Sequence, residues 1–256
     1  MSYLDDLYQL DGKIALVTGA GQGIGEAISI ALMRCGVTVI LAGRTQSKLE
    51  NVAEKAKEFG GKCSVLKMDV AQPQEIHDGF DWIQKTYGHL DILVNNAGIT
   101  IKGKAEELSF SDWQAVINTN LSGSFLCAQT AAKMMLPRHY GKIINVISTY
   151  AFVGRYMRVA YSASKGGELQ MTKTMAMEWA SRGVNVNALA PTATETPMTS
   201  IYKTDMQARE EMEKKIPAGR LATPEDMVGA ALFLASSASD FVTGHAILVD
   251  GGFTAI

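Results

Sequence analysis

The sequence predicts an α/β protein built on one doubly wound parallel sheet of about seven strands, with helices on both faces. Short runs that are apolar throughout alternate with helical segments along the chain, which is typical of parallel strands covered on both faces. No Pro/Ser-rich linker interrupts the alternation, so we expect residues 1–256 to form a single domain. Residues 192–215 are polar and fit the alternation least, which predicts a substrate lid.

Each strand is expected where a short apolar run is bounded by turn-forming or polar residues. The first such run, at 14–17, precedes a cluster of glycines, and the others follow at intervals that leave room for a helix. The expected strands are 14–17, 37–42, 63–68, 92–94, 142–147, 184–189 and 246–249.

Each helix is expected between two of these strands, where apolar residues recur with helical spacing. The segments are 24–35, 47–59, 74–87, 111–136, 160–181 and a helix after Pro224. Pro137 ends the 111–136 helix because proline cannot continue a helix. The result is a strand–helix alternation from one end of the chain to the other.

Composition excludes several classes of partner. The formal charge is −2, and no basic run is present, so we expect no nucleic-acid partner. The start, Met1 to Asp6, lacks the basic and apolar parts of a signal peptide, and no apolar stretch reaches the length of a membrane span. We therefore expect a cytoplasmic protein with no membrane partner.

No metal site is expected. The cysteines Cys35, Cys63 and Cys127 are scattered, and none has metal-ligand spacing. The four histidines are likewise isolated from one another. Buried, reduced thiols are the expected state of the cysteines.

A glycine-rich turn directly after the first strand predicts a nucleotide site. Gly19, Gly23 and Gly25, with Gln22 and Ile24 between them, have the spacing G-x-x-x-G-x-G. Glycines allow a tight turn and a close approach of backbone to a pyrophosphate, at which the next helix points its N-terminus. The alternative is that the glycines only mark a tight turn. The position between strand and helix favours a Rossmann-like dinucleotide site.

The end of the second strand favours NADP(H) over NAD(H). The run Leu41-Ala42-Gly43-Arg44 carries no carboxylate for a ribose 2′-hydroxyl, and the Arg44 guanidinium suits a 2′-phosphate. Lys48 lies one helical turn further on. Two observations count against this choice: Gln22 stands where a basic residue would have helped, and Arg44 could merely begin a solvated helix.

Tyr161, Lys165 and Ser148 form the strongest chemical signal. Tyr161 and Lys165 are four residues apart in a helical segment and so share a face, where an ammonium stabilises a phenolate. Ser148 ends the fifth strand, at the edge where open α/β sheets bind their ligands. A tyrosine with this neighbour can donate or accept a proton at a carbonyl oxygen that the Ser148 hydroxyl also holds.

With these motifs in place, the chain resembles the short-chain dehydrogenase/reductase family, and most closely its gluconate 5-dehydrogenase-like polyol and sugar-acid branch. The matching residues run nearly end to end: Gly19, Gly23, Gly25, Asp69-Val70, Asn95-Asn96-Ala97-Gly98, Asn120, Ser148, Tyr161, Lys165, Pro191, Thr196 and Asp250-Gly251-Gly252. The resemblance implies an NAD(P)-dependent oxidoreductase that moves a hydride between nicotinamide and a carbonyl or secondary alcohol carbon. It also implies a homotetramer, with a dimer as the second choice.

The resemblance also implies roles for single residues. Tyr161 would be the general acid or base, Ser148 would polarise the substrate oxygen, and Lys165 would hold the nicotinamide ribose and lower the Tyr161 pKa. The backbone of Asn120 would bind the water of a proton relay that reaches Lys165. The remaining cofactor contacts would be Asp69 and Val70 beside the adenine, Asn96, Ala97 and Gly98 near the adenosine ribose, and Pro191, Thr194 and Thr196 at the nicotinamide. Thr192 departs from the family, which usually has glycine there.

The substrate is expected to be a small polar hydroxy or keto compound, such as a sugar acid or a polyol. Tyr150, Arg155 and Arg158 follow Ser148, and Met198 lies in the expected lid, so these residues are candidates for substrate contact. An arginine there could pair with an anionic group, or both arginines could face solvent or a neighbouring subunit. Two alternatives stay open: a 3-oxoacyl thioester reductase of fatty-acid synthesis, and a nucleotide-sensing protein without catalysis.

Overall fold

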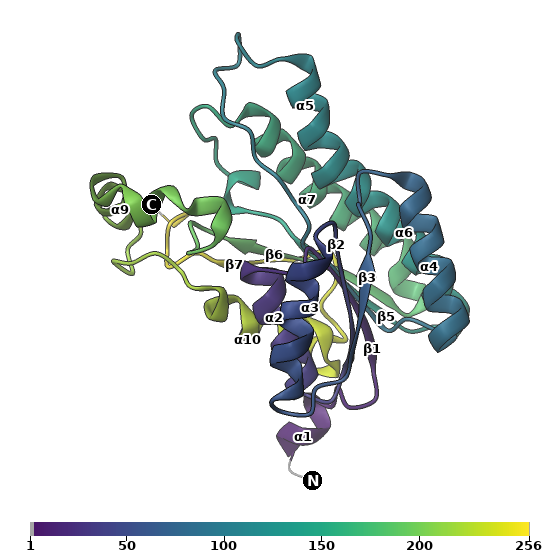
Figure 1. The fold of residues 1–256 in the computed structure, drawn as a ribbon. Coiled ribbons are helices and arrows are strands. Elements are labelled where there is room, and N and C mark those ends of the chain that lie inside the picture. Colours follow the sequence, from purple (N-terminus) through teal and green to yellow (C-terminus); the bar gives the residue numbers. More distant parts are fainter. Residues whose placement is uncertain (1–2, 256) are drawn as a thin grey trace.

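The fold places one sheet at the centre of the molecule (Figure 1). The structure is a computed structural model that describes residues 3–255. Met1 and Ser2, which belong to the N-terminal segment that led us to expect a cytoplasmic protein, lie outside the described residues. All seven strands are parallel, in the order β3-β2-β1-β4-β5-β6-β7. Their bounds are β1 Ile14–Thr18, β2 Thr38–Gly43, β3 Cys63–Lys67, β4 Ile92–Asn95, β5 Gly141–Val146, β6 Val184–Pro191 and β7 Ala246–Val249.

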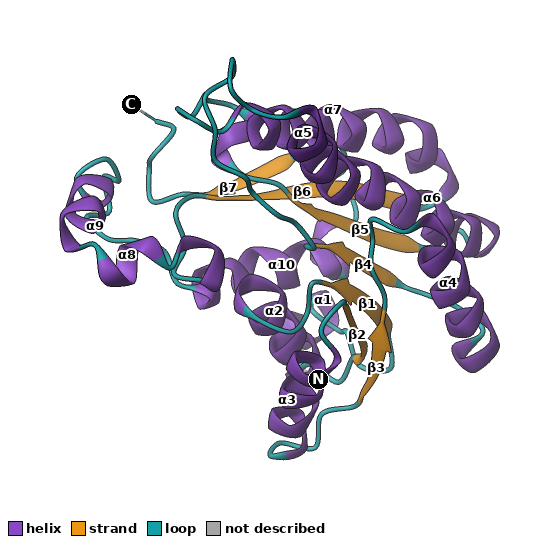
Figure 2. Cartoon of the chain, turned by 45° about the horizontal axis from the view of Figure 1, so that its top comes forward, coloured by secondary structure: helices purple, strands orange, loops and turns teal. Residues whose placement is uncertain are grey.

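Helices cover both faces of this sheet, which confirms the predicted α/β doubly wound class (Figure 2). On one face lie α2 (Gly23–Arg34), α3 (Gln46–Lys57) and α10 (Val228–Ala235). On the other lie α4 (Pro73–Tyr87), α6 (Gly123–Met135) and α7 (Val159–Trp179), with α5 (Phe110–Ile117) beside α7. The short helix α1 (Tyr3–Leu7) precedes β1.

Alternate strand residues supply the two halves of the core. Val17 and Val94 pack with the α2, α3 and α10 side chains, whereas their neighbours Leu16 and Leu93 pack with α4, α6 and α7. This division follows from the period of two along a strand. The central strands, such as β1 and β4, are buried on both faces and read as continuous apolar runs, whereas the edge strand β3 is only partly buried.

The order of the strands reverses between β1 and β4, which are neighbours although β2 and β3 intervene in the chain. Ligands in open α/β sheets bind at such a point, outside the carboxyl ends of the strands. The fold therefore brings the loops after β1, β4, β5 and β6 to one edge.

The long helix expected at 111–136 is interrupted, so this expectation was wrong in detail. A π-helical turn, Asn118–Ser122, separates α5 from α6. Single π turns often lie at functional sites. Within this one, the Asn120 side chain accepts from the Ile99 backbone N–H at 2.8 Å and donates to the Ile99 carbonyl at 3.0 Å.

The expected lid contains local helices that polarity alone did not predict. α8 (Ile201–Thr204) and α9 (Met206–Glu213) project from the sheet on the side of β7 (Figures 1 and 2). Arg209 of α9 pairs with Glu195 at 2.6 Å and with Glu213 at 2.8 Å. This pairing ties α9 to the loop that follows β6. No helix of residues 3–255 is long and apolar enough to cross a membrane.

Candidate active site

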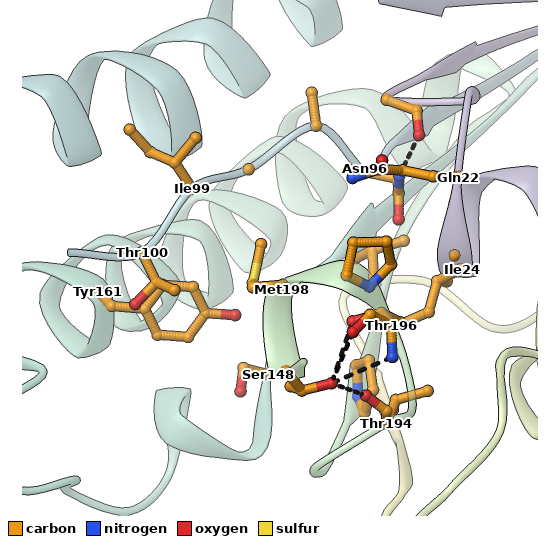
Figure 3. Close-up of a pocket in the computed structure, with 18 of the residues that line it drawn as sticks. Gln22, Ile24, Asn96, Ile99, Thr100, Ser148, Tyr161, Thr194, Thr196 and Met198 are labelled. Carbon is orange, nitrogen blue, oxygen red and sulfur yellow. Dashed lines mark hydrogen bonds between the residues drawn. The ribbon is translucent and has the colours of Figure 1, made fainter. Parts of the chain in front are cut away.

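A cavity of about 750 Å³ opens at the carboxyl edge of the sheet. It extends from the glycine turn after β1 to Tyr161 at the start of α7, and Met198 closes part of it (Figure 3). With two exceptions, every residue predicted to touch cofactor or substrate lines it. The exceptions are Gly25, which is packed behind the turn, and Asn120, which is fully buried.

The glycine turn has the close contacts that a pyrophosphate cradle needs. Gly19 and Gly23 have φ of 65° and 59°, which side chains disfavour. A Cβ on Gly19 would lie 2.9 Å from Asn96, whose side-chain nitrogen donates to the Thr18 and Gly19 carbonyls. Gln22, the N-cap of α2, makes no capping bond, so the first N–H groups of the helix are open to an anion.

Basic side chains lie beside this turn. Arg44 and Lys48 both line the cavity, and Lys48 Nζ donates to Gln22 Oε1 at 2.5 Å. Gln22, which counts against the choice of NADP(H) over NAD(H), carries no charge of its own, and its side-chain oxygen accepts from the Lys48 ammonium. The structure thus places the Lys48 ammonium against the N-cap of α2, and Arg44 in the wall of the same cavity.

Ser148 and Tyr161 both reach into the cavity (Figure 3). Ser148 lies just beyond β5 and caps the 3₁₀ turn Thr149–Ala151, where its hydroxyl accepts from the Tyr150 N–H at 3.2 Å. The Tyr150 and Tyr161 rings meet edge to face, with centroids 6.4 Å apart. This contact restrains the Tyr161 ring and leaves its hydroxyl directed at the open space.

Lys165 lies behind Tyr161 with its ammonium anchored. Its Nζ is 5.9 Å from the Tyr161 ring centroid and donates to the Val146 carbonyl at 2.9 Å. It is also 2.6 Å from Glu168, a buried carboxylate that the sequence reasoning did not single out. The signal was present, because residues three apart share a helix face.

The side chain of Asn120 is not available to a substrate. Besides its two bonds to Ile99, it donates to the Ser164 hydroxyl at 3.0 Å. The loop after β4 is thereby fastened to α7. Only a role for its backbone, as the resemblance implies, is compatible with this arrangement.

The loop after β6 places Thr194 and Thr196 in the cavity wall (Figure 3). The Thr194 hydroxyl donates to the Thr192 carbonyl at 2.9 Å, and the Thr199 hydroxyl donates to the Thr194 carbonyl. Thr192, which replaces the usual glycine, is nearly buried, and its hydroxyl has no protein partner. The substitution leaves Thr194 and Thr196 facing the cavity.

More cations line the cavity than the sequence shows as one basic run. Arg155, Arg158, Lys102 and Lys215 line the cavity from three separate segments. Neither arginine forms an ion pair with a carboxylate that the structure describes. Burial, helped by the like charge of Arg155, lowers the pKa of Arg158, which means that an anionic partner would be favourable there.

No group of three or more His, Cys, Asp or Glu side chains arranged to hold a metal ion occurs among residues 3–255. The polar side chains of the cavity wall include hydroxyls, amides, ammonium and guanidinium groups, together with the carboxylates of Asp69 and Glu211.

Similarities to known proteins extend over nearly the whole chain. A family model described as enoyl-(acyl carrier protein) reductase matches residues 19–254. A 2-dehydro-3-deoxy-D-gluconate 5-dehydrogenase from Bacillus subtilis is 42% identical, with 99% of each chain covered. A 3-oxoacyl-[acyl-carrier-protein] reductase from Thermotoga maritima is 39% identical, covering 95% of this chain and 98% of its own. The crystal structure of a gluconate 5-dehydrogenase from Burkholderia cenocepacia, in complex with NADP and tartrate, has a TM-score of 0.94 and 36% identity, covering 99% of this chain and 100% of that one.

Proposed function

The chain belongs to the short-chain dehydrogenase/reductase family, and from that premise we propose that it oxidises and reduces a sugar acid with NADP(H). It is an NAD(P)-dependent oxidoreductase that acts on CH–OH groups. The observation that carries the proposal is the meeting, in one cavity, of the open glycine turn with the Ser148 and Tyr161 hydroxyls and the Lys165 ammonium.

The proposed mechanism assigns one task to each side chain. The nicotinamide, when bound, supplies or accepts the hydride. The Tyr161 hydroxyl gives its proton to the carbonyl oxygen in reduction and takes it back in oxidation. The Ser148 hydroxyl donates a hydrogen bond to that same oxygen, and the Lys165 ammonium, 5.9 Å from the Tyr161 ring centroid, would stabilise negative charge that develops during the transfer. The backbone of Asn120 would hold the water that returns a proton to Lys165.

The residues present fit a dinucleotide. The cradle at Gly19 and the open start of α2 suit a pyrophosphate, and Asp69, Val70, Asn96, Ala97 and Gly98 line the adjoining wall. Arg44 and Lys48 support a 2′-phosphate, and the B. cenocepacia relative was crystallised with NADP. Pro191, Thr194 and Thr196 would hold the carboxamide end.

Arg44→Gln tests the preference for NADP(H). Loss of one charge-assisted phosphate contact is expected to raise the dissociation constant of NADPH about tenfold and to leave that of NADH unchanged. Arg182→Gln, an exposed arginine outside the cavity, is the matched control. Equal effects of Arg44→Gln on both nucleotides would remove the support for the 2′-phosphate contact.

A sugar acid is the substrate class that the cations support. Arg155 lies 5.9 Å from the Tyr150 ring centroid, and Arg158 lines the same cavity as Ser148, so a carboxylate on the substrate could meet these arginines. The names of the B. subtilis and B. cenocepacia relatives refer to gluconate-type compounds. Met198 and the expected lid, 192–215, would close over the bound molecule.

Replacing both Arg155 and Arg158 with glutamine separates recognition of the substrate's negative charge from catalysis. The KM for a keto sugar acid is expected to rise about tenfold or more, while the kcat/KM for an uncharged ketone should change little. An unchanged KM for the keto acid would exclude an anion contact at this position.

A 3-oxoacyl thioester is the second candidate, favoured by the T. maritima relative and by the family model. The cluster of Lys102, Arg155, Arg158 and Lys215 at the cavity, which is not visible as a basic run, could also meet an acidic carrier protein. Comparing kcat/KM for keto sugar acids, polyols and acyl thioesters with both nucleotides decides between the two. Faster reduction of the thioester would reverse the assignment.

A homotetramer is proposed for the assembly. Large apolar side chains are exposed on the α5–α7 side of the sheet, among them Phe110, Phe125 and Met177. Light scattering on an eluting column peak should give four chains per particle, and a monomer would contradict the proposal. The cytoplasmic location stays a prediction, which fractionation of the source cells would test.

A further inference from the structure

Glu168 is a fully buried carboxyl group one helical turn beyond Lys165 on α7. Its Oε2 atom lies 2.6 Å from Lys165 Nζ, and both side chains are almost completely inaccessible to solvent. A buried carboxylate is strongly disfavoured unless a positive charge or hydrogen bonds compensate it. The only cation that the structure places against it is the lysine of the active site.

The surroundings of Glu168 are polar but supply little direct compensation. Neither carboxyl oxygen of Glu168 makes a hydrogen bond in which both the distance and the angle are good. The nearby Ser124 hydroxyl nevertheless acts to lower the pKa of Glu168, which favours the carboxylate. The Glu168 carbonyl accepts from the Thr172 hydroxyl at 2.7 Å, and Thr172 accepts from Asn145 at 2.9 Å. These bonds join α7 to β5 and fix the backbone from which Glu168 reaches Lys165.

We propose that Glu168 is a positioning residue of this active site, whose carboxylate holds the Lys165 ammonium in place and keeps it charged where water is excluded. Burial alone lowers the pKa of Lys165, but the charges of Glu168 and Tyr161 outweigh burial and raise it. Burial raises the pKa of Glu168, against the opposing effect of Lys165. The positive charge behind the Tyr161 ring therefore depends on Glu168.

The other groups around this pair do not replace Glu168. From α6 and β5 come Ser124 and Asn145, and from the π turn comes Asn120, none of which titrates. On the cavity side, Tyr150 and the Arg158 guanidinium act on the Tyr161 end of the site. The charged groups that act on Lys165 are Glu168 and Tyr161.

The direct test is the titration of Lys165 in the protein without cofactor, followed by NMR of ¹³Cε-labelled lysine. The Lys165 signal is assigned as the one missing from Lys165→Met. In Glu168→Gln, the midpoint of this signal should fall by about 1–3 pH units, the usual effect of losing an opposite charge at contact distance. Glu168→Asp, which keeps the charge but is shorter, should lie between wild type and Glu168→Gln.

Glu178→Gln is the matched control, because Glu178 is an exposed carboxyl on the same helix. It should leave the Lys165 midpoint unchanged. A midpoint in Glu168→Gln equal to that of wild type would overturn the proposal and leave Glu168 a packing residue. Should Glu168→Gln not fold, the same comparison with Glu168→Asp decides, since an unshifted Lys165 there also contradicts the proposal.

The pH profile of alcohol oxidation provides a second readout. The proposal rests on the role of Lys165 given above, so the alkaline decline of kcat/KM should move to lower pH in Glu168→Gln and stay in place in Glu178→Gln. The NMR titration needs neither cofactor nor substrate, so failure of the proposed activity would leave its result intact. A loss of stability without a shift in either profile would identify a merely structural role.

Discussion

Replacing Gly25 with alanine probes the close contact between the glycine turn and the loop after β4. A methyl group there would overlap the Asn96 side-chain nitrogen and the Gly19 carbonyl oxygen. Overpacking of this kind costs about 1–3 kcal/mol, and loss of an Asn96 hydrogen bond adds about 1 kcal/mol. The free energy of unfolding should fall by about 3 kcal/mol, which for a chain of this size lowers Tm by about 6–12 °C.

Thermal unfolding followed by circular dichroism measures this change, and Gly229→Ala is its control. Gly229 is exposed in α10, and a Cβ there meets no atom within 4 Å. Alanine should therefore raise stability by about 1 kcal/mol through its helix propensity. The dissociation constant of NADPH should rise about tenfold in Gly25→Ala, because the turn is displaced. A Tm within about 2 °C of wild type, with unchanged NADPH binding, would refute this reasoning.

Two further predictions concern titratable groups. Hydrogen bonds from Arg220, at 2.6 and 2.8 Å, hold the pKa of the Asp226 carboxyl far below its usual range. The ionised Asp226 therefore stabilises the folded protein at a pH above the usual pKa of an aspartate, and this stabilisation is lost as the pH falls. The Tm difference between wild type and Asp226→Asn should shrink between about pH 6 and pH 3, and a constant difference would argue against the ion pair. Burial raises the pKa of the Cys127 thiol to about 12, so Cys127 should react with a disulfide reagent far more slowly than the half-buried Cys35 and Cys63. Peptide mass spectrometry after brief labelling measures this, and early modification of Cys127 would contradict it.

The centre of the sheet could be predicted from the sequence because its strands are buried on both faces. Runs such as 14–17 and 92–94 are apolar throughout, and the structure places strands there within one residue of the expected bounds. The glycine turn could be recognised for a related reason. Gly19 and Gly23 adopt positive φ, which few other residues tolerate, so the local sequence reports the backbone directly.

Other features depend on contacts between distant segments, which no local pattern contains. The π turn at Asn118–Ser122 lies in a segment with helical periodicity throughout, and Asn120 there bonds to Ile99 in the loop after β4. Lys102 and Lys215 are 113 residues apart in the sequence, and both line the cavity only because the fold brings their segments to it. The sequence alone does not indicate that Glu168 is buried, because a glutamate in a helix is ordinarily solvated.

The proton transfer by Tyr161 is tested most directly by the rate at which NADPH is consumed with a keto sugar acid, in wild type and in Tyr161→Phe. The phenyl ring keeps the edge-to-face contact with Tyr150 and removes only the hydroxyl. The rate should fall by about 10²–10⁴-fold, the usual contribution of a general acid, while the dissociation constant of NADPH stays the same. A Tyr161→Phe protein that keeps the wild-type rate would contradict the assignment of Tyr161 as the acid–base group.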